Sequence, residues 1–280
     1  MNAYAYRIVN VFTQGRAPLS GNPLCVFERA QTLDAASMQA LALQFNLSET
    51  TFILPSERAT ARVRIFTPSY ELPFAGHPTL GTAHVCRALG LGGDRLTLEM
   101  PAGIITVRAA GDRWTLQAKA PSWREVQEPR LTLAAILGLD EHDIGERPLW
   151  VNTGTEQLVV PLKSEAAVRR VRVRADLLAQ LASADGHSMA YVFAPSGAGL
   201  LARFFFPHGG SAREDPATGS ATANLGGWYL AMGHTLPCEF EISQGEYAGR
   251  PSALRLRVDA ERQIFVSGDV IELGRGTINL

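Results

Sequence analysis

Short apolar and β-branched runs, separated by Gly, Pro, Ser and Asn, recur along the whole chain and predict many short strands. These runs cover residues 6–12, 24–27, 50–54, 61–67, 96–100, 104–109, 114–118, 189–194 and 201–206. Apolar positions at helical spacing predict helices near residues 131–137 and 175–181, and a further helix that Asp34 caps. Strands therefore outnumber helices.

Two further segments, near residues 78–90 and 217–232, are rich in small and apolar residues at every position of a helical turn. We expect the earlier helix to begin at Pro78, because proline is favoured at the first helical position. A helix that is apolar all round must be buried. The pattern therefore predicts that each half is a strongly curved sheet wrapped around one central helix.

The segment around the first central helix recurs about half a chain later, which indicates an internal duplication. Residues 64–68 (RIFTP) and 71–79 (ELPFAGHPT) correspond to residues 203–207 (RFFFP) and 214–222 (EDPATGSAT). Two copies are too few for a solenoid, which needs at least about three stacked repeats. We therefore expect a fused pair of half-domains with a site in the cleft between them.

Chemically different residues occupy equivalent places in the two copies. The alignment sets His77 opposite Ser220, Leu72 opposite Asp215, and Glu49 opposite Ser188. One scaffold thus carries unlike polar groups, as an active site shared between two halves requires. Structural drift after duplication is the alternative explanation, because a fold does not by itself imply a function.

Length and composition narrow the class of protein and of ligand. At 280 residues the chain suffices for two domains of ~100 to 200 residues each. Hydrophobic residues make up 46% and charged residues 19%, and a net charge of −1 gives no reason to expect nucleic acid or an anionic membrane as partner. We therefore expect a small-molecule ligand.

The N-terminal residues and the cysteines indicate a cytoplasmic protein. Residues 1–7 lack the pattern of a secretory leader, and no apolar run approaches the ~18 residues of a membrane span. Cys25, Cys86 and Cys238 show no C-x-x-C spacing, so neither a zinc site nor a disulfide framework is indicated. We expect all three to be core residues in a reducing compartment.

Gly76-His77 and Gly219-Ser220 each lie where a loop enters a central helix. The first N–H groups of a helix have no partner within it and carry partial positive charge, so two such ends at one cleft suit an anionic substrate. Plain capping is the alternative, since Thr218 and Ser220 are both good cap residues.

Three titratable residues lie at element boundaries that the duplicated fold should bring to its midline. Asp215 precedes Pro216, and this pair is typical of an Asx turn. His77 is also compatible with a turn, and Glu49 with a solvated or capping role. Together, however, two carboxylates and an imidazole suffice for proton shuttling.

Other catalytic motifs fit the sequence less well. The stretch from Gly76 to Gly81 lacks the Lys-Ser/Thr ending of a phosphate-binding loop, and Gly219-Ser220-Ala221 lacks the second glycine of a nucleophile elbow. His77 and His84 have no matching cluster of further ligands, so we expect no metal site.

The motifs as a set resemble those of the PhzF-like proteins of phenazine biosynthesis, which have the diaminopimelate-epimerase-like fold. The matching stretches are Val11-Phe12, Gly21-Asn22-Pro23, Leu47-Ser48-Glu49-Thr50, residues 71–79, Asn152-Thr153-Gly154 and residues 214–221. The resemblance covers essentially the whole chain. It implies an α/β (α+β) protein in which each half-domain is a barrel-like, mostly antiparallel sheet around a central helix. One half-domain covers residues 1–119 and is completed by a strand at 268–280, the second covers 120–267, and the active site lies between them.

The resemblance also implies a mechanism. Epimerases of this fold have one cysteine at each helix entrance, and Ala75 and Thr218 stand there in this chain, so a two-thiol mechanism is absent. The isomerases of the family use a glutamate, matched by Glu49, to move a proton and a double bond in a cyclic dihydro-hydroxyanthranilate, without metal or organic cofactor. The resemblance further implies a homodimer. The catalytic residues that it implies are Glu49, His77 and Asp215, and the substrate-binding residues are Ser220, Gly76, Gly219, Asn22 and Thr218.

Two rival functions remain open from the sequence. One is a thiol-free epimerase or racemase of an amino or hydroxy acid, and the other is a non-catalytic metabolite-binding protein that keeps the anion site. General acid/base catalysis needs the pKa of Glu49 raised toward neutrality, which an apolar closed cleft supplies. The sequence leaves open the substrate and whether Asn152 and Thr153 contact it.

Overall fold

The computed structural model describes residues 2–280, so Met1, the first residue of the segment that lacks a leader pattern, lies outside them. The chain forms two compact units, Met1–Gln117 with Ser267–Leu280 and Ala118–Val266. The chain therefore first leaves unit 1 after Gln117, slightly before the turn at Ala120-Pro121-Ser122 where the sequence suggested a crossing.

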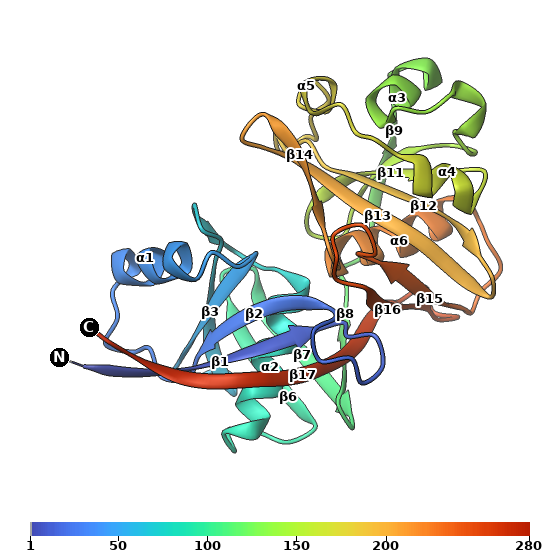
Figure 1. Ribbon diagram of the computed structural model, residues 1–280. Coiled ribbons are helices and arrows are strands. Elements are labelled where there is room, and N and C mark those ends of the chain that lie inside the picture. Colours follow the sequence, from blue (N-terminus) through green and yellow to red (C-terminus); the bar gives the residue numbers. More distant parts are fainter. Residues whose placement is uncertain (1) are drawn as a thin grey trace. The chain divides into compact units, whose positions relative to one another are not determined.

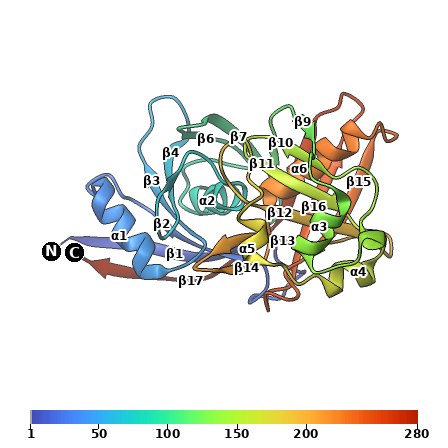
Figure 2. The same ribbon diagram turned by 90° about the horizontal axis from the view of Figure 1, so that it is seen from above.

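Unit 1 is a closed ring of strands around one helix, as Figures 1 and 2 show. Its ring runs β1–β2–β3–β4–β6–β7–β8–β17 and returns to β1. The strands are β1 (Ala3–Val11), β2 (Asn22–Phe27), β3 (Glu49–Leu54), β4 (Ala61–Phe66), β5 (Glu71–Leu72), β6 (Arg95–Met100), β7 (Gly103–Ala110), β8 (Arg113–Gln117) and β17 (Ile264–Asn279), whose first residues belong to unit 2.

Helix α2 (Gly76–Ala88) fills this ring and contacts the strands around it. Leu80, Val85 and Cys86 of α2 are fully buried, as expected for a helix without a polar face. Helix α1 (Ala35–Phe45) covers the outside of the ring and begins where Asp34 accepts a hydrogen bond from the Ser37 backbone N–H, which confirms the predicted cap.

Unit 2 repeats this plan around helix α6 (Gly219–Ala231). Its strands are β9 (Ser122–Glu125), β10 (Leu149–Asn152), β11 (Glu156–Pro161), β12 (Ala190–Ser196), β13 (Gly199–His208), β14 (Ser211–Asp215), β15 (Cys238–Gln244) and β16 (Ser252–Val258). Its outer helices are α3 (Arg130–Leu137), α4 (Glu165–Arg170) and α5 (Ala175–Leu178), with a 3₁₀ turn at Glu141–Asp143.

Strand pairing confirms the duplication. In unit 1 the pairs β1–β2, β2–β3, β3–β4 and β4–β6 are antiparallel, parallel, antiparallel and parallel. In unit 2 the pairs β10–β11, β11–β12, β12–β13 and β13–β15 follow the same sequence. Each central helix follows a short strand, β5 or β14, that pairs with β4 or β13. The predicted fold class is thus confirmed.

The strand register changes one equivalence in the alignment. Arg64 pairs with Phe52 in unit 1, and the equivalent Arg203 pairs with Val192 in unit 2. Glu49 lies three residues before Phe52, and Met189 lies three residues before Val192. Met189, and not Ser188, is therefore the counterpart of Glu49. The sequence alignment was therefore wrong by one residue. It assumed that the loop between the two paired strands has the same length in both units, and this length differs.

Some predicted boundaries also move. Helix α2 begins at Gly76 and not at Pro78. Proline is tolerated anywhere in the first helical turn, because the N–H groups of that turn have no partner within the helix and proline lacks only this group. Helix α5 ends at Leu178 instead of 181, since the chain closes there into a turn in which the Leu181 N–H bonds to the Leu178 carbonyl. The strands β10 and β11 and helix α4 lie in a stretch to which the sequence assigned no element.

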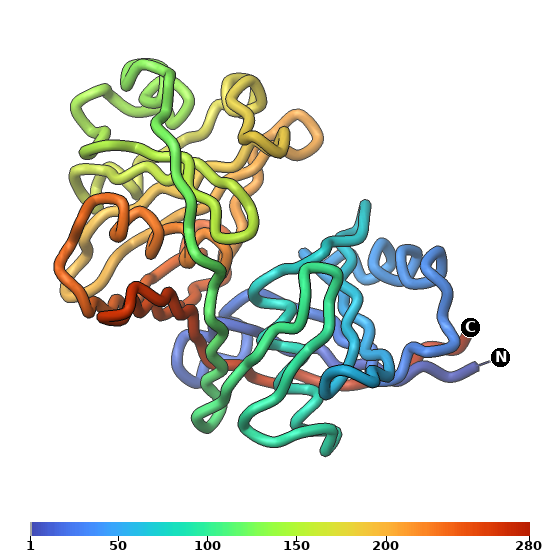
Figure 3. The backbone as a smooth tube through the Cα atoms, turned by 180° about the vertical axis from the view of Figure 1, so that it is seen from behind, coloured from blue at the N-terminus to red at the C-terminus, as the bar shows by residue number. Residues whose placement is uncertain are grey.

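The two ends of the described chain lie side by side in unit 1 (Figure 3), where Ala3 at the start of β1 pairs with Asn279 at the end of β17. Among the described residues, no helix is both long and apolar enough to cross a bilayer.

Candidate active site

The candidate residues of unit 1 meet at the start of α2. Glu49 is the first residue of β3 and pairs with Leu24 of β2 in parallel register. His77 is the second residue of α2, and its Nε2 lies 3.2 Å from Glu49 Oε2. Both side chains are largely buried, with 16% of Glu49 and 7% of His77 exposed. Residues 28 positions apart in sequence thus form one acid–imidazole pair.

The backbone of β2 sets the tautomer of His77. The ring forms a hydrogen bond with the Pro23 carbonyl, which can only accept. Since Nε2 faces Glu49, the nitrogen that carries the hydrogen toward Pro23 is Nδ1. In a neutral imidazole the other nitrogen is then an acceptor. The Nε2 lone pair therefore points at a carboxyl oxygen, and this contact is attractive only when a proton lies between the two atoms.

Burial also sets the charge of the imidazole. Burial lowers the pKa of His77 from 6.5 to about 3, although the Pro23 carbonyl acts in the opposite direction. The imidazole is therefore neutral at pH 7. The pair thus places a carboxyl group against a neutral imidazole where both side chains are largely buried.

Asn22 and the preceding turn lie next to the carbonyl that orients His77. Asn22 is fully buried at the start of β2, next to Pro23. Gly21 has φ +78°, and a Cβ there would lie 2.5 Å from the Val11 carbonyl oxygen, so only glycine fits. The Gly21-Asn22-Pro23 turn therefore fixes the carbonyl that orients His77.

In unit 2, Asp215 ends β14 and is tied to the start of α6. The Thr218 hydroxyl donates to Asp215 Oδ2 at 2.5 Å, and Gln244 Nε2 donates both to the Asp215 carbonyl (2.9 Å) and to Thr218 Oγ1 (3.0 Å). Thr218 occupies the N-cap position of α6, but its side chain caps no backbone N–H. The capping alternative is therefore wrong for Thr218, whose hydroxyl orients Asp215 instead.

Ser220 is the second residue of α6, the place that His77 holds in α2. Its Oγ accepts a hydrogen bond from Gln157 Nε2 at 3.0 Å, and Gln157 Oε1 accepts one from Asn224 Nδ2 at 2.9 Å. Gln157 and Asn224 are essentially inaccessible to solvent. Ser220 is thus the half-buried end of a buried chain of amides.

Both helix starts keep their first N–H groups clear of side-chain caps. Ala75 and Thr218 are the residues before α2 and α6, and neither provides a capping oxygen. Gly76 and Gly219 are the first helical residues and are buried. Each unit therefore offers a helix end with partial positive charge, as the anion hypothesis requires.

The cysteines do not take part in either set. Cys25 and Cys86 are fully buried, and burial raises the pKa of both thiols, that of Cys86 to about 12. Cys238 is only half-buried, so the prediction that all three are core residues is wrong for Cys238, which begins β15. Ala75 and Thr218 occupy the helix entrances where a two-thiol mechanism needs sulfur.

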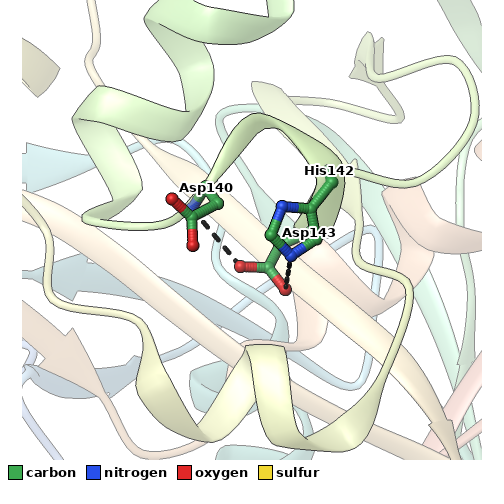
Figure 4. Close-up of side chains that lie close together, drawn as sticks. All are labelled: Asp140, His142 and Asp143. Carbon is green, nitrogen blue, oxygen red and sulfur yellow. Dashed lines mark hydrogen bonds and ion pairs between the residues drawn. The ribbon is translucent and has the colours of Figure 1, made fainter.

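One cluster in the described residues has the composition of a metal site, namely Asp140, His142 and Asp143 (Figure 4). Both oxygens of Asp143 already accept from Arg170 Nη2, at 2.8 and 3.0 Å, and one also accepts from the Asp140 backbone N–H. A guanidinium thus already neutralises the buried carboxylate. The cluster is accounted for as the cap of a 3₁₀ turn, and His84 packs against Trp114 elsewhere.

Sequence reasoning missed Pro23, Gln157, Asn224 and Gln244. The Pro23 carbonyl leaves no signal in the sequence. Asn224 was detectable, because it stands four residues after Ser220 and so shares its helix face. Gln157 and Gln244 come from strands remote in sequence, and only the fold brings them to α6.

Comparison with known proteins agrees with this description. Residues 9–273 match the family model described as phenazine biosynthesis-like protein. The chain is 38% identical to an uncharacterized isomerase of Pasteurella multocida, over 99% of this chain and 95% of that protein. It is 36% identical to the trans-2,3-dihydro-3-hydroxyanthranilate isomerase of Pseudomonas chlororaphis, over 98% and 99% of the two chains. A solved structure of a predicted epimerase from Pseudomonas aeruginosa is 29% identical with TM-score 0.81 over 99% of each chain.

Proposed function

We propose that this protein, which belongs to the phenazine biosynthesis-like family and is an isomerase, works by general acid/base catalysis. In the proposed reaction it moves a proton and a double bond within a small cyclic carboxylic acid. The substrate class follows the trans-2,3-dihydro-3-hydroxyanthranilate isomerases to which the chain is similar. No organic cofactor or metal is needed for this step, because it is redox-neutral and requires only proton transfers.

The contact between Glu49 and His77 is the observation that carries this proposal. In this proposal Glu49 gives a proton to one carbon of the substrate and removes one from another, so the double bond migrates and the atom count is unchanged. His77 stays neutral and lies beside Glu49, with its Nε2 3.2 Å from Glu49 Oε2.

The residues of unit 2 supply the rest of the proposed site. We assign Asp215 and Ser220 to polar contacts with the substrate, and the N–H groups at Gly76 and Gly219 to its carboxylate. Thr218, which the resemblance places among the substrate-binding residues, also holds Asp215 in place, since its hydroxyl bonds to Asp215 and Gln244.

Epimerisation of an amino or hydroxy acid is the second candidate, favoured by the similarity to the predicted epimerase of Pseudomonas aeruginosa. It uses the same proton transfer but inverts one stereocentre and leaves every double bond in place. Without thiols at Ala75 and Thr218, one acid/base group must serve both faces of the carbon. This requirement makes double-bond migration the better-supported reaction.

Incubation with trans-2,3-dihydro-3-hydroxyanthranilate in deuterated water separates these functions. Nuclear magnetic resonance should show a ring isomer with its double bond moved, at a rate that scales with enzyme concentration. Chiral chromatography of the same samples detects inversion. Inversion without migration would replace the proposal by epimerisation, and binding without any conversion would leave a metabolite-binding protein.

A further inference from the structure

The amide of Asn224 is held in one orientation by the backbone. Its Oδ1 accepts from the Thr153 backbone N–H at 2.8 Å, and its Nδ2 donates to the Thr155 carbonyl at 2.9 Å. A backbone N–H can only donate and a carbonyl can only accept, so the oxygen and nitrogen of Asn224 cannot exchange places. Asn224 is completely buried, which makes an unsatisfied amide costly.

This orientation propagates to Ser220. The second N–H of Asn224 Nδ2 meets Gln157, so the facing atom of Gln157 must be its oxygen. The Gln157 nitrogen then faces Ser220 Oγ at 3.0 Å and donates to it. Among the described residues Gln157 is the one hydrogen-bond partner of this hydroxyl, and it uses an acceptor site. The hydrogen of Ser220 is left for an acceptor elsewhere.

Unit 1 shows that the fold does not need these amides. The residue of α2 that corresponds to Asn224, five positions after the first helical glycine, is Gly81. A Cβ there would lie 2.7 Å from Leu24 Cδ2 and 2.9 Å from Val11 Cγ2, so aliphatic side chains cover this place. The contact between the central helix and the neighbouring strand is therefore made by aliphatic side chains in unit 1 and by amide side chains in unit 2. Packing alone does not explain the amides of unit 2.

We propose that Gln157 and Asn224 are positioning residues that set Ser220 as a hydrogen-bond donor toward an acceptor oxygen of the ligand, the carboxylate of the substrate class proposed above. This rests on the proposed function in one respect, that Ser220 meets the substrate. The chain of amides prepares the hydroxyl before binding, so no hydrogen bond within unit 2 has to break when the anion arrives.

A double-mutant cycle with trans-2,3-dihydro-3-hydroxyanthranilate as substrate tests this inference. Ser220→Ala and Gln157→Met should each raise KM about tenfold, about 1.4 kcal/mol, with a smaller change in kcat. If Gln157 acts through Ser220, adding Gln157→Met to Ser220→Ala should change KM less than twofold. Effects that multiply in the double variant would overturn the positioning role.

Gln157→Glu keeps the volume of the side chain and the acceptor for Asn224, so it preserves the fold if Gln157→Met does not. Its carboxylate accepts from Ser220 and turns the hydroxyl hydrogen inward. KM should rise at least tenfold, and comparison with the same change in the Ser220→Ala background measures the part due to charge repulsion. A KM within twofold of wild type would contradict the inference.

Ser183→Ala is the matched control, because it removes another buried hydrogen bond of unit 2, to the His187 backbone N–H, without touching the chain of amides. Its kinetic constants should equal those of wild type, and thermal unfolding of every variant reports the structural cost. Failure of wild type to convert the substrate would overturn the proposed function and this ligand assignment together. An active enzyme in which the effects of the Gln157 and Ser220 substitutions on KM multiply is a different result, because it would overturn only the positioning role.

Discussion

The starts of helices α2 and α6 are the same structure with different chemistry. Both helices begin with glycine after an uncapped residue and run for 13 residues inside a curved sheet. In unit 1 the second residue is His77, which faces Glu49, while in unit 2 it is Ser220, which faces an amide. Unit 1 therefore places a carboxyl group beside an imidazole at this position, and unit 2 places a hydroxyl group beside an amide.

The two units also differ in their carboxylates. Leu72 and Met189 stand where the other unit has Asp215 and Glu49, so each unit keeps only one of the two carboxylates. In the function proposed above, Glu49 changes its charge during proton transfer, whereas the groups of unit 2 bind the substrate without changing theirs.

The largest effect should come from removing the proton carrier of unit 1. Glu49→Gln keeps shape and hydrogen bonding but cannot exchange a proton, so kcat should fall roughly 10²- to 10⁴-fold. Calorimetric titration with the substrate should give nearly unchanged affinity. Glu71→Gln, which alters another glutamate of unit 1 paired with Arg64, serves as control and should keep full activity. Retention of more than a tenth of kcat in Glu49→Gln would show that another group moves the proton.

The second expected effect is the pH dependence of stability that His77 gives to unit 1. His77 has a pKa of about 3 in the folded state and 6.5 in the unfolded chain, so below pH 6.5 the unfolded chain binds a proton that the native state refuses. Stability is complete above that pH and is lost as pH falls, by about 2 kcal/mol at pH 5 for this group alone.

Urea unfolding at pH 7.5 and pH 5.0 of wild type and His77→Gln measures this contribution, because all other titrating groups are common to both proteins. Wild type should lose more stability than the variant on acidification. Burial also lowers the pKa of His84, which adds a loss of the same sign to both proteins. Equal losses would mean that His77 is protonated as readily in the folded state as in the unfolded chain.

A moderate effect is expected at the anion end of α6. Gly219→Val puts a branched side chain where the ligand carboxylate should approach the helix N-terminus, so affinity should weaken at least tenfold, about 1.4 kcal/mol. Titration of the Glu49→Gln protein with and without this change avoids turnover. Unchanged affinity would place the carboxylate elsewhere and leave Gly219 as a turn residue.

The smallest effect should follow removal of sulfur from both units. Cys25→Ala, Cys86→Ala and Cys238→Ala combined should leave kcat within about twofold, because proton transfer by an acid such as Glu49 needs no thiol. Replacement of the two buried cysteines should lower the unfolding temperature, since each leaves a small cavity. Loss of turnover in a folded variant would revive a thiol mechanism.

The sequence by itself determined many of the strands, both central helices, the duplication, and the lack of thiols at Ala75 and Thr218, because these depend on local pattern and on direct comparison of two segments. Only the tertiary structure decided which groups touch. Strand register brings Pro23 and Glu49 to the two ring nitrogens of His77, and it makes Met189 the counterpart of Glu49 in the repeat. A shift of one residue would exchange the two faces of a strand. Hydrogen bonding between distant segments then set the orientation of the His77 ring and of the Gln157 amide that faces Ser220.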